Sequence, residues 1–119
     1  MNLRLLTILF IVTETVALGQ SSDTIKIKLV AGQEIIRGAN VVVKDHTPII
    51  GTATDMTGLA TLIIPNNKDL VEISFIGPYV RLKIERPTDS IYFDLNTKKA
   101  TFYKDNKKIK TRKQIVSGY

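Results

Sequence analysis

The chain has no cysteine and no tryptophan, and its only histidine is His46. Without cysteine no disulfide can restrict the unfolded chain, so burial and hydrogen bonding must hold the fold together. Without thiolates or a second imidazole, the usual zinc and transition-metal sites cannot be assembled. A serine nucleophile would also have to take His46 as its base. We therefore read His46 as an exposed loop residue and expect no metal site, no cofactor and no hydrolase chemistry.

Acidic residues offer little more to catalysis or metal binding. Asp45, Asp55 and Asp69 lie in expected loops, where they could meet at one end of a sandwich and bind a hard cation such as calcium. Their spacing matches no calcium loop, so turn formation explains them better. No glycine-rich phosphate loop follows any expected strand either. The sequence therefore indicates a protein that is not an enzyme.

The one long apolar run lies at the N-terminus, where residues 1–19 have the layout of a secretory signal peptide. Arg4 supplies the positive charge, residues 5–12 are apolar except for Thr7, and residues 17–19 are suited to cleavage. The alternative is a buried N-terminal strand or helix. The run is too short for a bilayer, which needs roughly 20 residues in a helix. We expect an exported mature chain from Gln20 with no transmembrane span and, lacking cysteine, no lipidated anchor.

The remaining chain repeats short segments of strand-like composition at steps of roughly ten residues. Valine, isoleucine and threonine are abundant in it, and no helical periodicity is apparent. Turn formers separate seven predicted strands: 24–30, 39–44, 49–54, 59–64, 70–76, 79–85 and 90–95. A parallel sheet is implausible because its crossovers need a dozen or more residues, usually helical. The pattern predicts an all-β fold, a seven-stranded antiparallel sandwich.

The amino-acid sequence of these strands and turns resembles that of a known family. The residues that carry the resemblance are Gly38-Ala39-Asn40-Val41-Val42-Val43-Lys44, Gly51-Thr52-Ala53-Thr54-Asp55 with Gly58, Ile64-Pro65, and Leu70 with Ile73-Ser74-Phe75-Ile76-Gly77. They are similar to the carboxypeptidase regulatory-like domain, a transthyretin-like (prealbumin-like) β-sandwich found at the front of SusC-type TonB-dependent receptors of Bacteroidetes. The resemblance implies this fold, no active site, and structural roles at turns and strand ends for Gly38, Asn40, Asp55, Gly58 and Gly77.

Two positions depart from the family pattern. Family members usually have an aromatic residue in the strand after the Asp-x-x-Gly turn, near the position of Ala60 here. They also usually have a Gly-Tyr pair after the Ser-Phe-Ile strand, and here Pro78 separates Gly77 from Tyr79. Asp55 can accept a hydrogen bond from the backbone two residues on, and Gly58 can adopt positive φ without steric cost. The two departures, at Ala60 and Pro78, concern local loop geometry more than the fold.

The formal net charge of +6 is concentrated at the C-terminus. Residues 20–97, the expected sandwich domain, carry eight basic and nine acidic side chains, whereas residues 98–119 carry eight basic side chains and Asp105 alone as an acid. We expect a basic tail that is either a solvated extension or a small hairpin turning at Asp105-Asn106. Its candidate anion-binding residues are Lys98, Lys99, Lys104, Lys107, Lys108, Lys110, Arg112 and Lys113.

Two hypotheses about function follow. The first is a non-catalytic module of the bacterial envelope, in the periplasm, on the outer membrane or secreted, that contacts a protein partner through a sheet edge or loops. The second is a protein that binds an acidic glycan or lipopolysaccharide through the basic tail. A weaker alternative is the truncated N-terminal module of a TonB-dependent receptor. Phe102 and Tyr103 beside lysines would suit single-stranded nucleic acid, but export argues against that partner.

Overall fold

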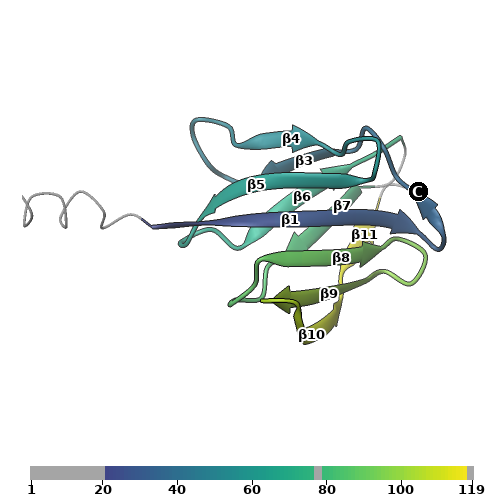
Figure 1. Ribbon diagram of the computed structural model, residues 1–119. Helices are drawn as coiled ribbons and strands as arrows, with labels where there is room; N and C mark the ends of the chain where they lie inside the picture. The colour runs from purple at the N-terminus through teal and green to yellow at the C-terminus, as the bar shows by residue number, and fades with distance from the viewer. Residues whose placement is uncertain (1–20, 77–78, 118–119) are drawn as a thin grey trace, which may run out of the picture.

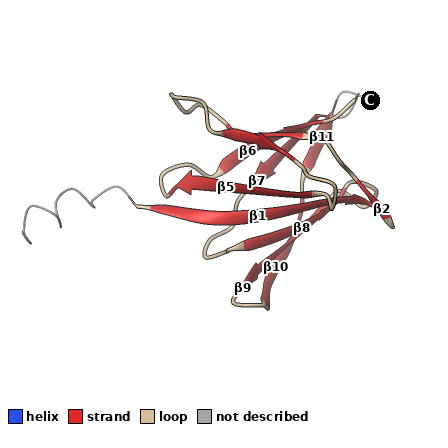
Figure 2. Ribbon diagram, turned by 45° about the horizontal axis from the view of Figure 1, so that its top comes forward, coloured by secondary structure: helices blue, strands red, loops and turns tan. Residues whose placement is uncertain are grey.

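The computed structural model describes residues 21–76 and 79–117, which form strands and loops with no helix among them (Figures 1 and 2). The all-β prediction is confirmed. No helix in this part of the chain is long and apolar enough to cross a membrane. Eleven strands are present: β1 (Ser22–Ala31), β2 (Glu34–Ile35), β3 (Asn40–Val43), β4 (Gly51–Ala53), β5 (Leu59–Pro65), β6 (Leu70–Ser74), β7 (Tyr79–Lys83), β8 (Ser90–Asp94), β9 (Lys99–Lys104), β10 (Lys107–Lys113) and β11 (Ile115–Ser117).

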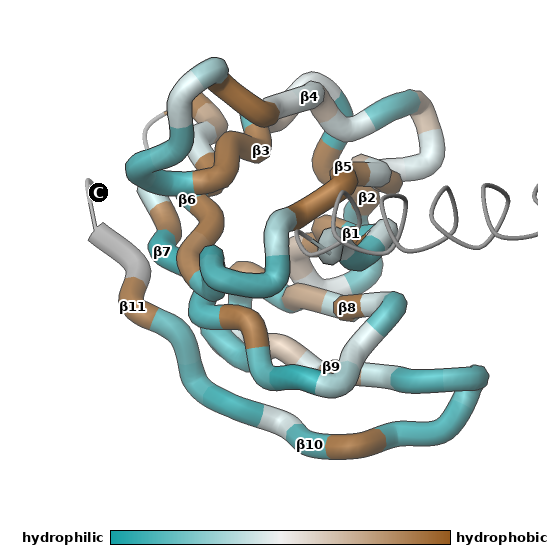
Figure 3. The backbone as a smooth tube through the Cα atoms, turned by 90° about the vertical axis from the view of Figure 1, so that its left-hand side faces the viewer, coloured by the Kyte–Doolittle hydropathy of each residue, from teal (hydrophilic) through white to brown (hydrophobic). Residues whose placement is uncertain are grey.

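The strands form two sheets that face each other (Figure 3). The six-stranded sheet has the order β10-β9-β8-β1-β2, and β5 also pairs with β1. The five-stranded sheet has the order β11-β7-β6-β3-β4. The chain passes from β10 in one sheet to β11 in the other, so the C-terminal strands join the two sheets on one side of the molecule.

One strand pair corrects the antiparallel prediction. β1 and β8 are parallel, in a register that runs from Lys26↔Ser90 to Val30↔Asp94. All other pairs among the described residues are antiparallel. The crossover that a parallel pair requires is present but is not a helix. It is the whole intervening chain, which adds β2 and β5 to the same sheet and β3, β4, β6 and β7 to the other before β8 returns to β1.

The core consists of apolar side chains at alternate positions of the facing strands. In β1 the buried residues are Ile25, Ile27 and Leu29, and in β9 they are Ala100 and Phe102. Alternation places every second side chain on the inner face of a strand. These residues belong to one continuous cluster shared by both sheets. Burial of this cluster is what stabilises the chain in place of disulfides.

The seven predicted strands are all present, with no end shifted by more than two residues, but the count of seven is wrong. The structure adds β2 after a turn at Gly32-Gln33 and three strands beyond residue 97, the expected end of the sandwich. Of the two interpretations of the basic segment, the structure contains the hairpin and not the solvated extension. The physical reason is burial, because Ala100 and Phe102 are fully buried between lysine-rich flanks. The predicted signal peptide lies outside the described residues.

Candidate binding surfaces

The Asp55 turn is held by its own carboxylate. Asp55 Oδ1 accepts hydrogen bonds from Thr57 N (2.8 Å), Thr57 Oγ1 (2.6 Å) and Leu59 N (3.1 Å). These bonds, the Thr57 hydroxyl first, lower the pKa of the Asp55 carboxyl below its ordinary value of 3.8. Every acceptor site on Oδ1 therefore serves the turn, and Asp55 acts as the structural residue that the sequence predicts.

Gly58, the other residue of this turn, stands where no other residue fits. Its φ is +78°, and a Cβ there would lie 2.6 Å from Ile35 Cγ2 and 2.8 Å from Leu29 O. Gly38 also has positive φ (+72°), and its N–H donates to Thr54 O over 2.9 Å. Asn40 is the first residue of β3 and is exposed. Gly77 lies outside the described residues.

The three loop aspartates do not meet. Asp55 follows β4, whose Ala53 pairs with Asn40 at the start of β3, whereas Asp45 follows the other end of β3. Asp69 lies with Asp45, where both line a small cavity with Lys68. A cation cannot be shared by groups at opposite ends of the sandwich. Within the described residues no group of three acidic, histidine or cysteine side chains is placed to hold a metal ion.

The predicted basic residues lie on and around the β9–β10 hairpin. The hairpin turns at Asp105 and Asn106, both with positive φ (52° and 65°), as a type I′ turn requires. Lys104 and Lys107 face each other beside this turn, and Lys98 precedes β9 with a φ of 62°. β10 is an edge strand, and all seven of its residues are exposed. In Figure 3 it runs along the outside of the molecule and is mostly hydrophilic.

The hairpin presents its charge on two opposite faces. Lys110 and Arg112 pair with the buried Phe102 and Ala100, so they share the face of β10 that turns toward the five-stranded sheet. There Lys110 Nζ lies 3.4 Å from Glu85 Oε1. Residues Lys99, Lys108 and Lys113 occupy the outer face. The structure therefore divides the predicted basic set instead of gathering it into one site.

The outer face of the six-stranded sheet carries a basic and aromatic surface that extends beyond the hairpin. Pairing across β1, β8, β9 and β10 aligns Lys26, Ser90, Tyr103 and Lys108 in one row, and Lys28, Tyr92, Thr101 and Thr111 in the next. A third row contains Asp94, Lys99 and Lys113. Strands lie about 4.8 Å apart, so a row of four spans about 14 Å. We call this surface the lysine–tyrosine face: Lys26, Lys28, Tyr92, Lys99, Tyr103, Lys108 and Lys113.

In the described part of the chain, the lysines of this face form no ion pair with an acidic side chain. The ion pairs formed within residues 21–76 and 79–117 involve Lys44, Arg81, Lys83, Arg86 and Lys110, and none involves a lysine of this face. Asp94 is the acidic residue in the three rows of this face. Its Oδ1 accepts hydrogen bonds from Gly32 N (3.0 Å) and Asn96 N (2.9 Å). Lys28 Nζ donates to Thr57 O. The face therefore keeps a net positive charge that the fold does not neutralise.

The outer face of the five-stranded sheet is different because its charges pair with one another. The Glu72 carboxylate lies 3.1 Å from Lys44 Nζ and 3.9 Å from Arg81 Nε, and it accepts a hydrogen bond from the Tyr79 hydroxyl. The Tyr79 bond, followed by Lys44, lowers the pKa of Glu72, and Glu72 in turn raises the pKa of Lys44. Each charged group of this cluster therefore has an oppositely charged partner within 4 Å, unlike the lysines of the lysine–tyrosine face.

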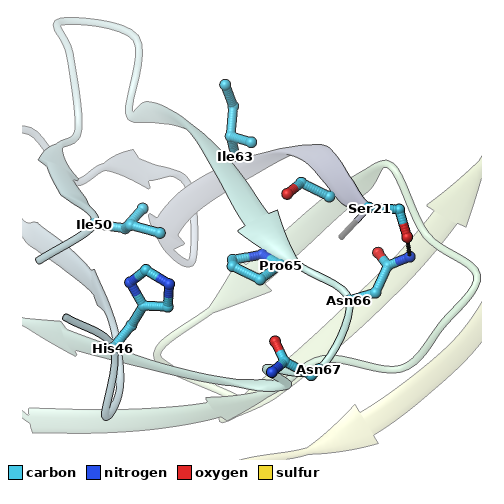
Figure 4. A pocket seen from close by; sticks show the side chains of 8 residues that line it. Ser21, His46, Ile50, Ile63, Pro65, Asn66 and Asn67 are labelled. Atoms are coloured by element: carbon cyan, nitrogen blue, oxygen red, sulfur yellow. Dashed lines mark hydrogen bonds between the residues drawn. The ribbon is translucent and has the colours of Figure 1, made fainter. Parts of the chain in front are cut away.

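His46 lines a cleft of about 670 Å³ between the β3–β4 loop and the end of β5 (Figure 4). The other lining residues are Ser21, Ser22, Ile50, Ile63, Pro65, Asn66 and Asn67. His46 Nδ1 is 2.7 Å from Pro48 O, so its ring is oriented by its own loop. The cleft is a mixed apolar and amide surface beside a strand, and its described lining residues include no acid or second base to partner the histidine.

Comparison with known proteins finds no relative: no protein-family model, no curated protein and no solved structure matches this chain.

Lys26, Lys28 and Tyr92 are the binding candidates that sequence reasoning missed. The alternation of β1 does place Lys26 and Lys28 on a solvated face, and that signal is local. Their nearness to the basic hairpin depends on the β1–β8 and β8–β9 pairings, which join residues far apart in the chain.

Proposed function

We propose that this protein is a non-catalytic binding module of the bacterial envelope, and that its lysine–tyrosine face binds an anionic polymer or lipid headgroup such as an acidic glycan or lipopolysaccharide. The observation that carries the proposal is the set of five lysines on one sheet face that form no ion pair with any described residue. The transthyretin-like topology and membership of the carboxypeptidase regulatory-like class are part of the same proposal. The residue resemblance supports them, together with the two-sheet all-β fold.

An open sheet face suits an extended polymer better than a small molecule. The lysines lie in three adjacent rows, so several anionic groups of one polymer can be contacted at once. The exposed side of Tyr92 offers a planar apolar surface between them, on which a sugar ring can pack. Charges on such a surface attract a polyanion over a Debye length, about 10 Å at 0.1 M salt.

A pair of matched double variants tests the proposal. Lys108→Thr with Lys113→Thr removes two charges from the lysine–tyrosine face, and Lys110→Thr with Arg112→Thr removes two from the opposite face of the same strand. With heparin and lipopolysaccharide vesicles as probes, we expect the first pair to weaken binding about three- to tenfold. The second pair should change it much less. Equal loss in both pairs, or binding that persists in about 0.5 M salt, would contradict a site on this face.

Contact with a protein partner is the second candidate function. It is favoured by one observation, which is the absence of any charged residue from β5, a strand at the edge of the six-stranded sheet opposite β10. Open edges are the sites at which another chain can add a strand.

A further inference from the structure

The free edge of β5 can be identified residue by residue. Leu29 N donates to Gly58 O over 2.8 Å at one end of the β1–β5 ladder, and Asn66 N donates to Ser21 O over 3.1 Å at the other. Bonded and non-bonded pairs alternate along an antiparallel ladder. The even-numbered residues of β5 therefore bond to β1. The odd-numbered residues, 59, 61, 63 and 65, direct their backbone groups away from it.

Both ends of this edge are closed. Leu59 N donates to Asp55 Oδ1, and Leu59 O accepts from Asp55 N over 3.0 Å. Pro65 has no N–H, and its carbonyl accepts from Arg86 Nη2 (3.1 Å) and Lys68 N (3.0 Å). The middle of the edge, Thr61 and Ile63, has no such partners in the described part of the chain, where β5 pairs with β1 alone. Two N–H groups and two carbonyls, about 7 Å apart along the strand, are therefore free.

The cleft at His46 continues from this edge. Ile63 and Pro65 of β5 form one side of it, and His46 and Ile50 of the β3–β4 loop form the other (Figure 4). Ile63 is 60% exposed, which is unusual for an isoleucine in the middle of a strand. The volume of the cleft, about 670 Å³, is in the range of a ligand pocket. A free edge beside a cleft lined by apolar and uncharged polar side chains offers both parts of a strand-addition site, backbone pairing and a pocket for side chains.

We propose that the β5 edge at Thr61 and Ile63 binds a short extended peptide segment of a partner protein, with an uncharged apolar side chain seated in the His46 cleft. The inference deepens the second candidate function and rests on it. A peptide backbone supplies N–H and carbonyl groups at the spacing of the free ones. A second copy of this chain is a poorer occupant, because a free edge of two residues is short for an interface that must bury roughly 1,200 Å² or more.

The test is selection of peptides from a random heptapeptide library in about 0.5 M salt, which screens the lysine–tyrosine face. The best peptide, synthesised with a fluorescent label, is then titrated against the protein and its variants. Thr61→Pro removes one outward N–H and no bond to β1, as edge positions tolerate. We expect peptide affinity to fall about tenfold. Ile63→Lys, a surface change in the cleft that retains the backbone, should weaken binding similarly.

Thr111→Pro is the matched control, because Gln114 N bonds Lys98 O and the alternation leaves the Thr111 N–H pointing outward from the opposite edge of the same sheet. It should leave affinity unchanged, and so should Lys108→Thr with Lys113→Thr, which disables the polyanion site alone. The Thr61 and Ile63 amides should exchange hydrogen quickly in the free protein and slowly with peptide. The proposal would be overturned if the library yields no binding peptide, or if Thr61→Pro and Thr111→Pro lower peptide affinity equally. It would also be overturned if the native protein is a dimer that Thr61→Pro converts to a monomer.

Discussion

The two long edges of the six-stranded sheet are treated in opposite ways by the sequence. β10, at the bottom of Figure 1, has five basic residues in seven, a bulge between Lys108 and Lys110, and side chains exposed on both faces. β5, at the other edge, has no charged residue and is closed only at its ends by Asp55 and Pro65. Lysines and bulges are the usual protection of an edge against another strand. The contrast indicates that β10 is kept single, while the centre of β5 is left available.

The largest effect should come from breaking the attachment of the basic edge to the core. Phe102 of β9 is fully buried and pairs with Lys110 of β10. Phe102→Ala should lower the free energy of unfolding by about 3–5 kcal/mol, measured by urea denaturation. Ile109→Ala, a change at a 45% exposed site in the same hairpin, should stay within about 0.5 kcal/mol. A small effect of Phe102→Ala would mean that the hairpin is not part of the cooperative fold.

Substitution of two buried threonines, one near each edge, measures how much each contributes to the stability of the fold. Near β5, Thr54 Oγ1 donates to Ile36 O (2.8 Å) and accepts from Ala39 N (3.0 Å). Near β9, Thr88 Oγ1 donates to Tyr103 O (2.9 Å) or Ser90 O (3.1 Å). Thr54→Val leaves a buried N–H without an acceptor and should cost about 1–3 kcal/mol, whereas Thr88→Val should cost about 0.5–1.5 kcal/mol. If Ala39 N found another acceptor, Thr54→Val would be the less destabilised of the two variants. Thermal melts of both variants measure this difference.

Charge removal tests whether lysine is what keeps β10 single. Replacing Lys108, Lys110, Arg112 and Lys113 with threonine gives β10 the character of β5. We expect stability near that of the native protein but self-association that grows with concentration, measured by sedimentation velocity. Thr61→Lys with Ile63→Lys is the converse change and should reduce any association of the native protein. A monomeric threonine variant would show that the bulge alone protects this edge.

The smallest effect concerns Asp55, which closes one end of the β5 edge. Its pKa is lowered in the folded protein, so its carboxylate stabilises the fold above the unfolded value, and that contribution is lost as pH falls through the folded pKa. Asp55→Asn should therefore lower the urea midpoint at neutral pH. Its difference from the native protein should shrink below pH 3.8. A difference independent of pH down to about 2 would assign the effect to packing instead of charge.

The strands themselves could be predicted because their signal is local. The alternation of apolar and polar residues in β1, and the Asp55 to Gly58 turn, each depend on a few neighbouring residues. β9 was harder, since Ala100 and Phe102 are only two buried positions among lysines and threonine, and a charge-dense terminus is usually solvated. The short β2 and β11 offer too few residues for a periodic signal.

The binding surfaces depend on which strands become neighbours, and no local pattern records that. The lysine–tyrosine face exists because β8 inserts between β1 and the hairpin, which brings Lys28 beside Tyr92. The His46 cleft exists because the β3–β4 loop of one sheet meets the end of β5 in the other. Sequence reasoning found the charge of the hairpin and the isolation of His46, but neither set of neighbours.

By itself the amino-acid sequence determined that this protein is all-β, where most of its strands begin and end, and that its positive charge is concentrated near the C-terminus. These properties follow from side-chain alternation, turn residues and composition, which act over a few residues. Only the tertiary structure decided that the basic segment belongs to the core, that β1 and β8 run parallel, and which edge remains open. Strand pairing joins distant parts of the chain through uniform backbone hydrogen bonds, so the choice of partner depends on how all the apolar faces are buried together.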